Sequence, residues 1–111
     1  MGAALLVFVG GGLGALLRYL AGLLAQGPLT TLAINVSGSF AIGLLVAIPA
    51  GPLRLFLAVG LLGGFTTFSA FSLDTIQLWQ RGQAGLALAY VLGTTILSLA
   101  AAASAAWLVR N

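Results

Sequence analysis

The sequence has no cysteine, no histidine and no lysine, and Asp74 is its only acidic residue. Without cysteine or histidine, the chain has no thiolate or imidazole to bind zinc and no imidazole base to activate a serine nucleophile. One carboxylate also cannot form the pair of acids that glycoside hydrolysis requires. We therefore expect that the protein is not an enzyme.

Charged residues of either sign are scarce. Only 5% of the residues are charged and 61% are hydrophobic, which is too little polar surface to cover a water-soluble globule. The four arginines are spread along the chain and form no basic patch, so nucleic acid is not expected as a partner. We predict an all-α integral membrane protein in contact with lipid, and 111 residues accommodate four spans of about 20 residues each.

Three clusters of helix-breaking residues divide the chain into four apolar segments. The clusters are Gln26-Gly27-Pro28, Pro49-Ala50-Gly51-Pro52 and Arg81-Gly82. They predict transmembrane helices at about residues 3–25, 30–48, 53–79 and 84–109. The chain has no long linker and no repeat of fixed period, so we expect a single four-helix transmembrane domain over residues 1–111.

The third predicted helix is interrupted near its middle by two adjacent glycines and two threonines, within Gly63–Thr67. Each glycine weakens a helix by about 0.8 to 1 kcal/mol relative to alanine, and β-branched threonine is also unfavourable. The pattern predicts a broken helix, and carbonyl groups freed at membrane depth are a candidate ion site. The alternative is a glycine notch for close helix packing, formed by Gly60 and Gly64.

Polar side chains recur every four residues along two predicted helices and therefore lie on one stripe of each helix. The residues are Thr31, Asn35 and Ser39 in the second helix and Tyr90, Thr94 and Ser98 in the fourth. Their hydroxyl and amide groups can replace the water around a small anion without supplying a fixed charge. The alternative is hydrogen bonding between helices, worth on average about 0.6 kcal/mol.

Phe68 and Phe71 lie three residues apart, on one side of the second half of the third predicted helix. The edge of an aromatic ring is positive, so rings presented edge-on can accept an anion in a low-dielectric site. The alternative is that both phenylalanines face lipid or pack between helices.

The arginines give no preference for one orientation in the membrane. Arg54 and Arg110 would favour one side as cytoplasmic, whereas Arg18 and Arg81 would favour the other. Such a chain can insert both ways, and oppositely inserted copies can pair about a two-fold axis in the membrane plane. We therefore predict an antiparallel, dual-topology homodimer, with a parallel oligomer of single topology as the alternative.

Taken together, these motifs resemble those of the Fluc-type fluoride channels, also called the CrcB family. The resemblance covers nearly the whole chain and is carried by one segment in each of the first three predicted helices. The segments are Gly11-Gly12-Leu13-Gly14-Ala15 with Arg18-Tyr19, then Asn35-Val36-Ser37-Gly38-Ser39-Phe40, and then Gly63-Gly64-Phe65-Thr66-Thr67-Phe68-Ser69-Ala70-Phe71.

The resemblance implies a fluoride-selective passive channel that exports fluoride across the inner (plasma) membrane as a multi-pass protein. It implies a dual-topology dimer with two fluoride pathways. It also implies a structural sodium ion at the dimer centre, held by the backbone carbonyls of Gly63 and Thr66 from both broken helices.

The resemblance further assigns individual residues to the pathway. Phe68 and Phe71 match the family's aromatic box, Asn35 its pathway asparagine, Tyr90, Thr94 and Ser98 its polar track, and Thr31 the mouth. Arg18 matches a basic residue near the vestibule, and Asp74 falls where an acidic residue often follows the third-helix motif. Ala70 departs from the threonine or serine frequent at its position, which removes one hydroxyl.

Two other functions are compatible with the composition. A small multidrug exporter shares the four helices and the dual topology, but it needs an intramembrane carboxylate in its first helix, and Asp74 lies near the end of the third. A non-conducting helical bundle would explain the glycines and hydroxyl groups but not the broken third helix.

Overall fold

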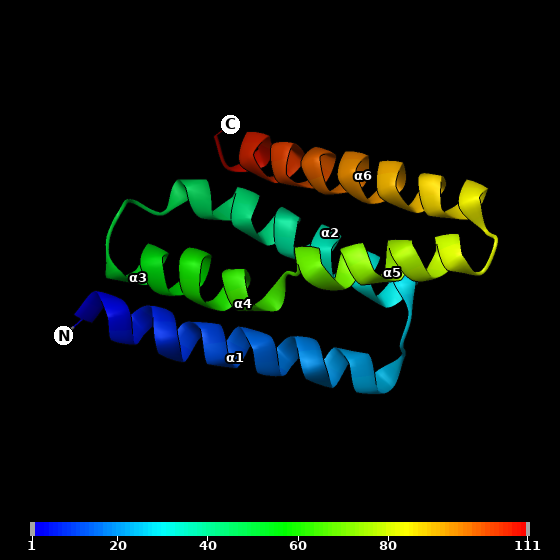
Figure 1. The fold of residues 1–111 in the computed structure, drawn as a ribbon. Helices are drawn as coiled ribbons and strands as arrows, with labels where there is room; N and C mark the ends of the chain where they lie inside the picture. Colours follow the sequence, from blue (N-terminus) through cyan, green and yellow to red (C-terminus); the bar gives the residue numbers. More distant parts are fainter. Residues whose placement is uncertain (1, 111) are drawn as a thin grey trace.

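The computed structural model describes residues 2–110, and all of its regular structure within that range is helical. Four helical runs are long and apolar enough to cross a membrane: Gly2–Leu24, Pro28–Ala47, Pro52–Gln80 and Ala84–Arg110. This confirms the prediction of an all-α chain with four potential spans. The runs alternate in direction, so that both ends of the chain lie at one end of the bundle (Figure 1).

Two spans are single helices and two are composite. The first span is α1 (Gly2–Leu24), and the second joins α2 (Pro28–Leu44) to a 3-10 turn, η1 (Leu45–Ala47). The third consists of α3 (Pro52–Arg54), the π-helix η2 (Leu55–Leu62), α4 (Gly63–Phe65) and α5 (Phe68–Gln80). The fourth is α6 (Ala84–Arg110).

The tight turns are formed by residues suited to them. Gly27 has φ 117°, a left-handed conformation that favours glycine, and Pro28 then starts α2 at a position where its missing N–H is not needed. Gly82 has φ 78° in the turn between α5 and α6. Both turns lie at the end of the bundle opposite to the chain ends (Figure 1).

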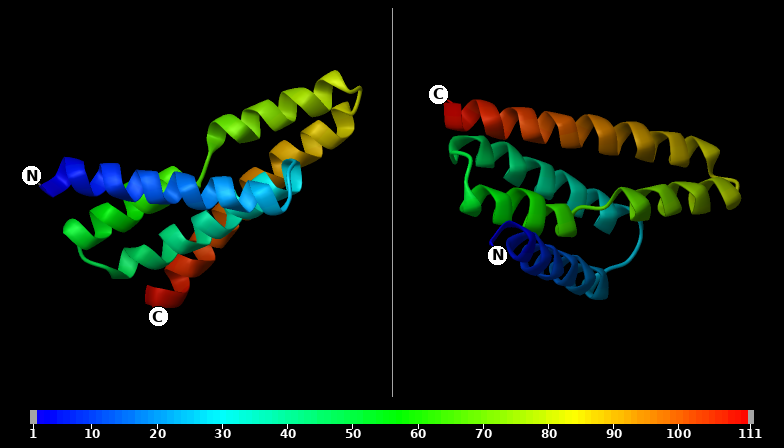
Figure 2. Two further views of the ribbon diagram at one scale, coloured as in Figure 1. Left: turned by 90° about the horizontal axis from the view of Figure 1, so that it is seen from below. Right: turned by 60° about the vertical axis from the view of Figure 1, so that its left-hand side comes forward.

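The third span is interrupted at Thr66 and Thr67, both of which have extended backbone conformations. Figure 2 shows that α5 leaves the break in a different direction from α4. Gly63 and Gly64 are helical, so the expectation that the glycines form part of the break is wrong. The two β-branched residues take the extended conformation, which suits their side chains better than a helix does.

The glycines serve close packing between α1 and the first half of the third span, as the alternative interpretation proposed. The Cβ of an alanine at Gly10 would lie 2.9 Å from the Cα of Gly60, and one at Gly64 would meet the carbonyl oxygen of Gly11. The two helix backbones are therefore in direct contact, as small residues permit in membrane helix pairs.

The remaining helices pack around a different seam. α2 runs along α6, and α5 packs on the first half of α6. Phe71 and Leu78 of α5 form a buried cluster there with Ala87 and Tyr90 of α6. One packed pair is α1 with the first half of the third span, and the other is α2 with α6. The break therefore lies where these two pairs meet.

We expect Gly14→Ala to destabilise the protein, because its Cβ would collide with the backbone carbonyl oxygen of Leu61. Overpacking of this kind costs about 1–3 kcal/mol. The matched control is Gly12→Ala, whose Cβ would meet no atom within 4 Å, so its stability should equal or exceed that of the wild type. Thermal unfolding in detergent measures the difference, and equal stability of the two variants would contradict the packing described.

Candidate functional site

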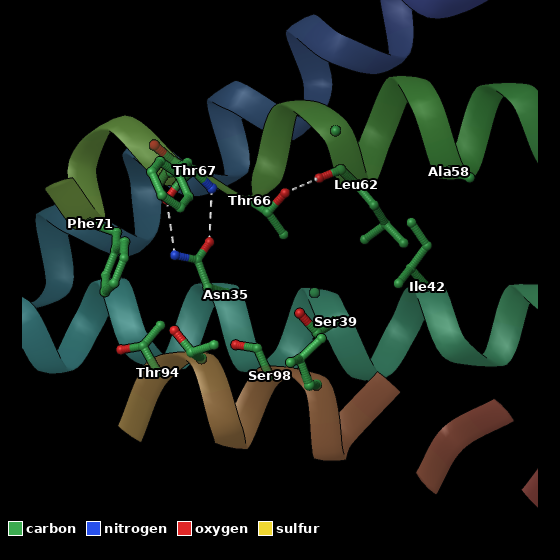
Figure 3. A pocket seen from close by; sticks show the side chains of 15 residues that line it. Asn35, Ser39, Ile42, Ala58, Leu62, Thr66, Thr67, Phe71, Thr94 and Ser98 are labelled. Carbon is green, nitrogen blue, oxygen red and sulfur yellow. Dashed lines mark hydrogen bonds between the residues drawn. The ribbon is translucent and has the colours of Figure 1, made fainter. Parts of the chain in front are cut away.

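A pocket of about 450 Å³ opens beside the break, between α2, the third span and α6 (Figure 3). Seven of the ten residues predicted to form a site line it. They are Asn35, Gly63, Thr66, Phe68, Phe71, Thr94 and Ser98. The lining among the described residues contains no charged side chain, so the pocket offers hydrogen-bonding groups without a formal charge. We call it the main pocket.

Asn35 holds the break through two reciprocal hydrogen bonds with Thr67 (Figure 3). Its Nδ2 donates to the Thr67 carbonyl oxygen at 2.9 Å, and its Oδ1 accepts from the Thr67 N–H at 2.8 Å. The amide therefore satisfies both backbone groups of a residue outside the helix. A primary amide has a second N–H, which leaves Asn35 one further hydrogen to donate.

The two threonines of the break also bond back to the chain on either side. The hydroxyl and the N–H of Thr66 both donate to the carbonyl oxygen of Leu62, at 2.9 and 3.0 Å. Thr67 is the N-cap of α5, where its Oγ1 accepts from the N–H of Ala70 at 3.1 Å. Each half of the third span is thus terminated by a side chain of the break itself.

These bonds divert the donors that a continuous helix would supply to two carbonyl groups. In an α-helix, the Thr67 N–H would bond the Gly63 carbonyl and the Ala70 N–H would bond the Thr66 carbonyl. Here the former donates to Asn35 and the latter to the Thr67 hydroxyl. Gly63 and Thr66 are the residues predicted to hold sodium.

Backbone carbonyls at a broken membrane helix are suitable ligands for Na⁺, and the C-terminal end of a half-helix also attracts cations. Within residues 2–110, no cluster of three His, Cys, Asp or Glu side chains could hold a metal ion. A cation at this break would therefore depend on carbonyl oxygens, and the residues present fit that requirement.

Three aromatic rings form a continuous line from the pocket into the core. Phe68 and Phe71 meet edge-to-face, with centroids 5.4 Å apart and planes at 68°, and the Phe71 ring lies 5.2 Å from that of Tyr90. Their exposure differs sharply, since Phe71 is 8% exposed and Phe68 is 78% exposed. Phe71 is thus fixed by this chain, whereas Phe68 projects from it.

The polar stripe on α6 separates into two kinds of group. Tyr90 does not line the main pocket, and its hydroxyl donates to Oδ2 of Asp74 at 3.1 Å. The Thr94 and Ser98 hydroxyl oxygens are buried and have no hydrogen-bond partner among the described residues. Thr94 as a whole is only 6% exposed. Because buried polar groups are normally hydrogen-bonded, these two hydroxyls are candidate donors to a bound species.

Arg18 and Thr31 do not reach the main pocket. Both line a second pocket of about 220 Å³ between α1, α2 and the start of α5. The hydroxyl of Thr31 donates to the carbonyl of Gly27, the N-cap of the same helix, at 3.4 Å. Thr67 lines both pockets and is the wall that they share.

The main pocket also contains hydrogen-bonding residues that the predicted site omitted, namely Ser39, Thr67 and Thr95. The four-residue spacing from Asn35 was a sequence signal for Ser39. For Thr67 the available signal was its place in the break. Thr95 gave none, because it lies outside the stripe that runs through Thr94.

Comparisons with known proteins agree on one family. The family model described as CrcB-like protein, Camphor Resistance (CrcB), matches residues 5–106. A protein of Paracoccus denitrificans named fluoride-specific ion channel FluC is 54% identical over 104 residues, which cover 86% of this chain and 84% of the relative. Proteins with the same name from Thermus thermophilus and Agrobacterium fabrum are 50% and 46% identical, over 86% and 96% of this chain and 85% and 94% of their own.

We expect Asn35→Leu to lower the free energy of unfolding by about 1–3 kcal/mol for each Thr67 backbone group left without a partner. The control is Ser37→Ala, because the Ser37 hydroxyl bonds only the Ile34 carbonyl of its own helix. Thermal unfolding in detergent should show lower stability for Asn35→Leu and little change in stability for Ser37→Ala. Equal stability of both variants would show that the amide does not hold the break.

Proposed function

This chain belongs to the CrcB family, and on that basis we propose that it is a fluoride-selective channel through which fluoride leaves the cell passively. The chain is a multi-pass membrane protein and not an enzyme. The observation that carries the proposal is the main pocket, which combines aromatic rings, an asparagine and unbonded hydroxyls with no charged side chain.

Fluoride holds its water strongly, and an unpaired ion in a low-dielectric interior would cost tens of kcal/mol on a Born estimate. A pathway must therefore replace the lost water continuously. The remaining N–H of Asn35 and the hydroxyls of Thr94 and Ser98 can donate to the ion, and the edges of Phe68 and Phe71 add weaker positive potential. Narrow spacing of such donors would disfavour the larger chloride ion.

A passive mechanism is favoured over proton-coupled exchange, because no titratable carboxylate lines the main pocket. Asp74, the only acidic residue, lies in α5 and accepts a hydrogen bond from Tyr90. A small multidrug exporter would need an intramembrane carboxylate free to exchange protons for cations. The non-conducting bundle remains the alternative from another class, and it offers no account of the unbonded Thr94 and Ser98 hydroxyls.

We further propose that two oppositely inserted copies form an antiparallel dimer with two pathways in the inner (plasma) membrane. Two features support this assembly. Phe68 is 78% exposed beside the main pocket, so a second copy would complete the aromatic lining. The arginines are also balanced between the two ends of the bundle (Figure 1). α3 with Arg54 and the end of α6 with Arg110 lie opposite to the α5–α6 turn with Arg81, and Arg18 lies in the half of α1 nearer to that turn.

The proposed dimer would hold a structural sodium ion at its centre. The carbonyls of Gly63 and Thr66 would supply the ligands, since their helical donors are bonded elsewhere. The ion would neutralise the partial negative charge at the end of α4 and fasten the two broken helices to each other.

The proposal is tested by fluoride efflux from liposomes that contain the purified protein, with a potassium shunt to dissipate voltage and chloride recorded alongside. We expect fast fluoride release with little chloride release and no requirement for a proton gradient. If properly reconstituted protein released neither ion, conduction would be excluded and the non-conducting bundle favoured. Flux that required a proton gradient would instead favour an exchanger.

We expect Phe68→Ile and Phe71→Ile to reduce fluoride efflux to the level of empty liposomes without preventing dimerisation, because isoleucine has no positive ring edge. The matched control is Phe8→Ile on α1, since Phe8 is 79% exposed, much like Phe68, and lies outside the main pocket. Efflux and size-exclusion chromatography should be measured for all three variants. Unchanged flux in both pocket variants would defeat the role of the rings.

A further inference from the structure

Arg18 is a cation inside the first span whose position in the fold has a specific consequence. Its Nε donates to the carbonyl oxygen of Gly64 at 3.2 Å, across from α1 to α4. Among residues 2–110 it forms no ion pair, and the carboxylate of Asp74 is bonded to Tyr90. A charged side chain at this depth is costly unless it is paired with another group, and here that group is a backbone carbonyl.

The carbonyl group that accepts the Arg18 hydrogen bond lies at the end of the first half of the third span. Gly64 belongs to the last turn before the break, where carbonyl groups lose their helical donors and carry the negative end of the helix dipole. Basic side chains commonly bond the last carbonyls of a helix for this reason. The bond is charge-assisted and thus stronger than one between neutral groups.

The glycines of α1 bring Arg18 close enough to make this bond. Gly14 and Gly11 lie one and two turns before Arg18 on the same face, and both pack directly on the third span. The bond is made by Nε rather than by the ends of the guanidinium group. The terminal nitrogens have no hydrogen bond to another described residue, and the side chain lines the second pocket.

We infer that Arg18 is a positioning residue that caps the first half of the broken third span through its Nε–H bond to Gly64. Asn35 fixes the other side of the break at Thr67, so the segment is held from α1 and from α2. Arg18 thereby orders the neighbouring carbonyls of Gly63 and Thr66. The part of this inference that concerns sodium rests on the proposed function.

Three variants separate the bond from the charge. Arg18→Gln removes the charge but keeps an N–H donor the same number of bonds from the backbone as Nε. Arg18→Met removes both at similar length. Arg81→Met is the matched control, because Arg81 is exposed in a turn and lies on the same side of the membrane in the arginine balance. Arg81→Met therefore changes the charge balance that governs membrane insertion in the same way as Arg18→Met.

The first measurement reads the bond directly and needs neither sodium nor conduction. Gly64-Phe65 is the only Gly-Phe pair in the sequence, so labelling glycine carbonyls with ¹³C and phenylalanine amides with ¹⁵N marks one peptide bond. We expect the Gly64 carbonyl resonance to move upfield in Arg18→Met and to stay near wild type in Arg18→Gln and Arg81→Met. An unchanged resonance in Arg18→Met would overturn the inference.

The second measurement is the sodium concentration that half-stabilises the dimer, read by subunit exchange in detergent. We expect Arg18→Met to raise it about tenfold, since the net contribution of a hydrogen bond to a charged group corresponds to at least that factor. Arg18→Gln should rescue part of the loss, because its neutral N–H forms a weaker bond than the guanidinium. If Gln and Met raised it equally, the Nε–H donor would not be responsible, and positioning through Nε would be wrong. Loss of the arginine charge alone should lower this sodium concentration, because a like charge weakens a nearby cation site.

The two measurements also distinguish failure of the inference from failure of the proposed function. If the protein conducts fluoride but the Gly64 carbonyl resonance does not change in Arg18→Met, only the inference is contradicted. A Gly64 resonance that responds as expected, in a protein that moves no fluoride and binds no sodium, supports Arg18 as the cap while the proposed function fails.

Discussion

In hydrocarbon no water is available to bond a free N–H or C=O group, so each backbone group of a spanning segment needs a partner from the protein or from a bound ion. The extended residues Thr66 and Thr67 violate helical pairing in the middle of the third span. The neighbouring elements compensate for this break. Asn35 pairs both backbone groups of Thr67, and Arg18 pairs the carbonyl of Gly64. The glycine contacts place α1 against the third span, and these bonds then complete the pairing of backbone groups at the break.

Much of this arrangement could be predicted from the sequence, because breaker residues and apolar length are local signals. The four spans and the interruption within Gly63–Thr67 are visible in the sequence itself. The convergence of Asn35 with Phe68 and Phe71 was implied only by the resemblance to the fluoride-channel family. The exact place of the break could not be predicted, because helix propensity marks the glycines, and not the threonines, as the weakest helix formers. Gly64 is in contact with α1, as the alternative interpretation of the Gly60 and Gly64 spacing proposed, and its backbone is helical there.

The partners of individual polar groups were the other part that sequence could not supply. The spacing of Tyr90, Thr94 and Ser98 predicts one stripe. In the structure, however, the Tyr90 hydroxyl donates to Asp74, whereas the other two hydroxyls have no partner among the described residues. Arg18 is similar, since the family resemblance implies a charge near the vestibule and only the fold reveals its bond to Gly64. Such pairings depend on helix packing in three dimensions, because the bonded residues lie 16 and 46 positions apart.

The placement of charge explains how a pathway for an anion can bind its ion and still release it. Two unit charges 4 Å apart attract by about 4 kcal/mol at an effective dielectric constant of 20, which would slow the exit of an anion by roughly a thousandfold. Arg18 lies in the second pocket, with Thr67 between it and the main pocket, and its Nε is bonded to the chain. The main pocket is left with neutral donors, each of which contributes far less than a full charge. In the proposed pathway an ion would therefore pass from one donor to the next through small barriers, while the arginine stabilises the break that positions those donors.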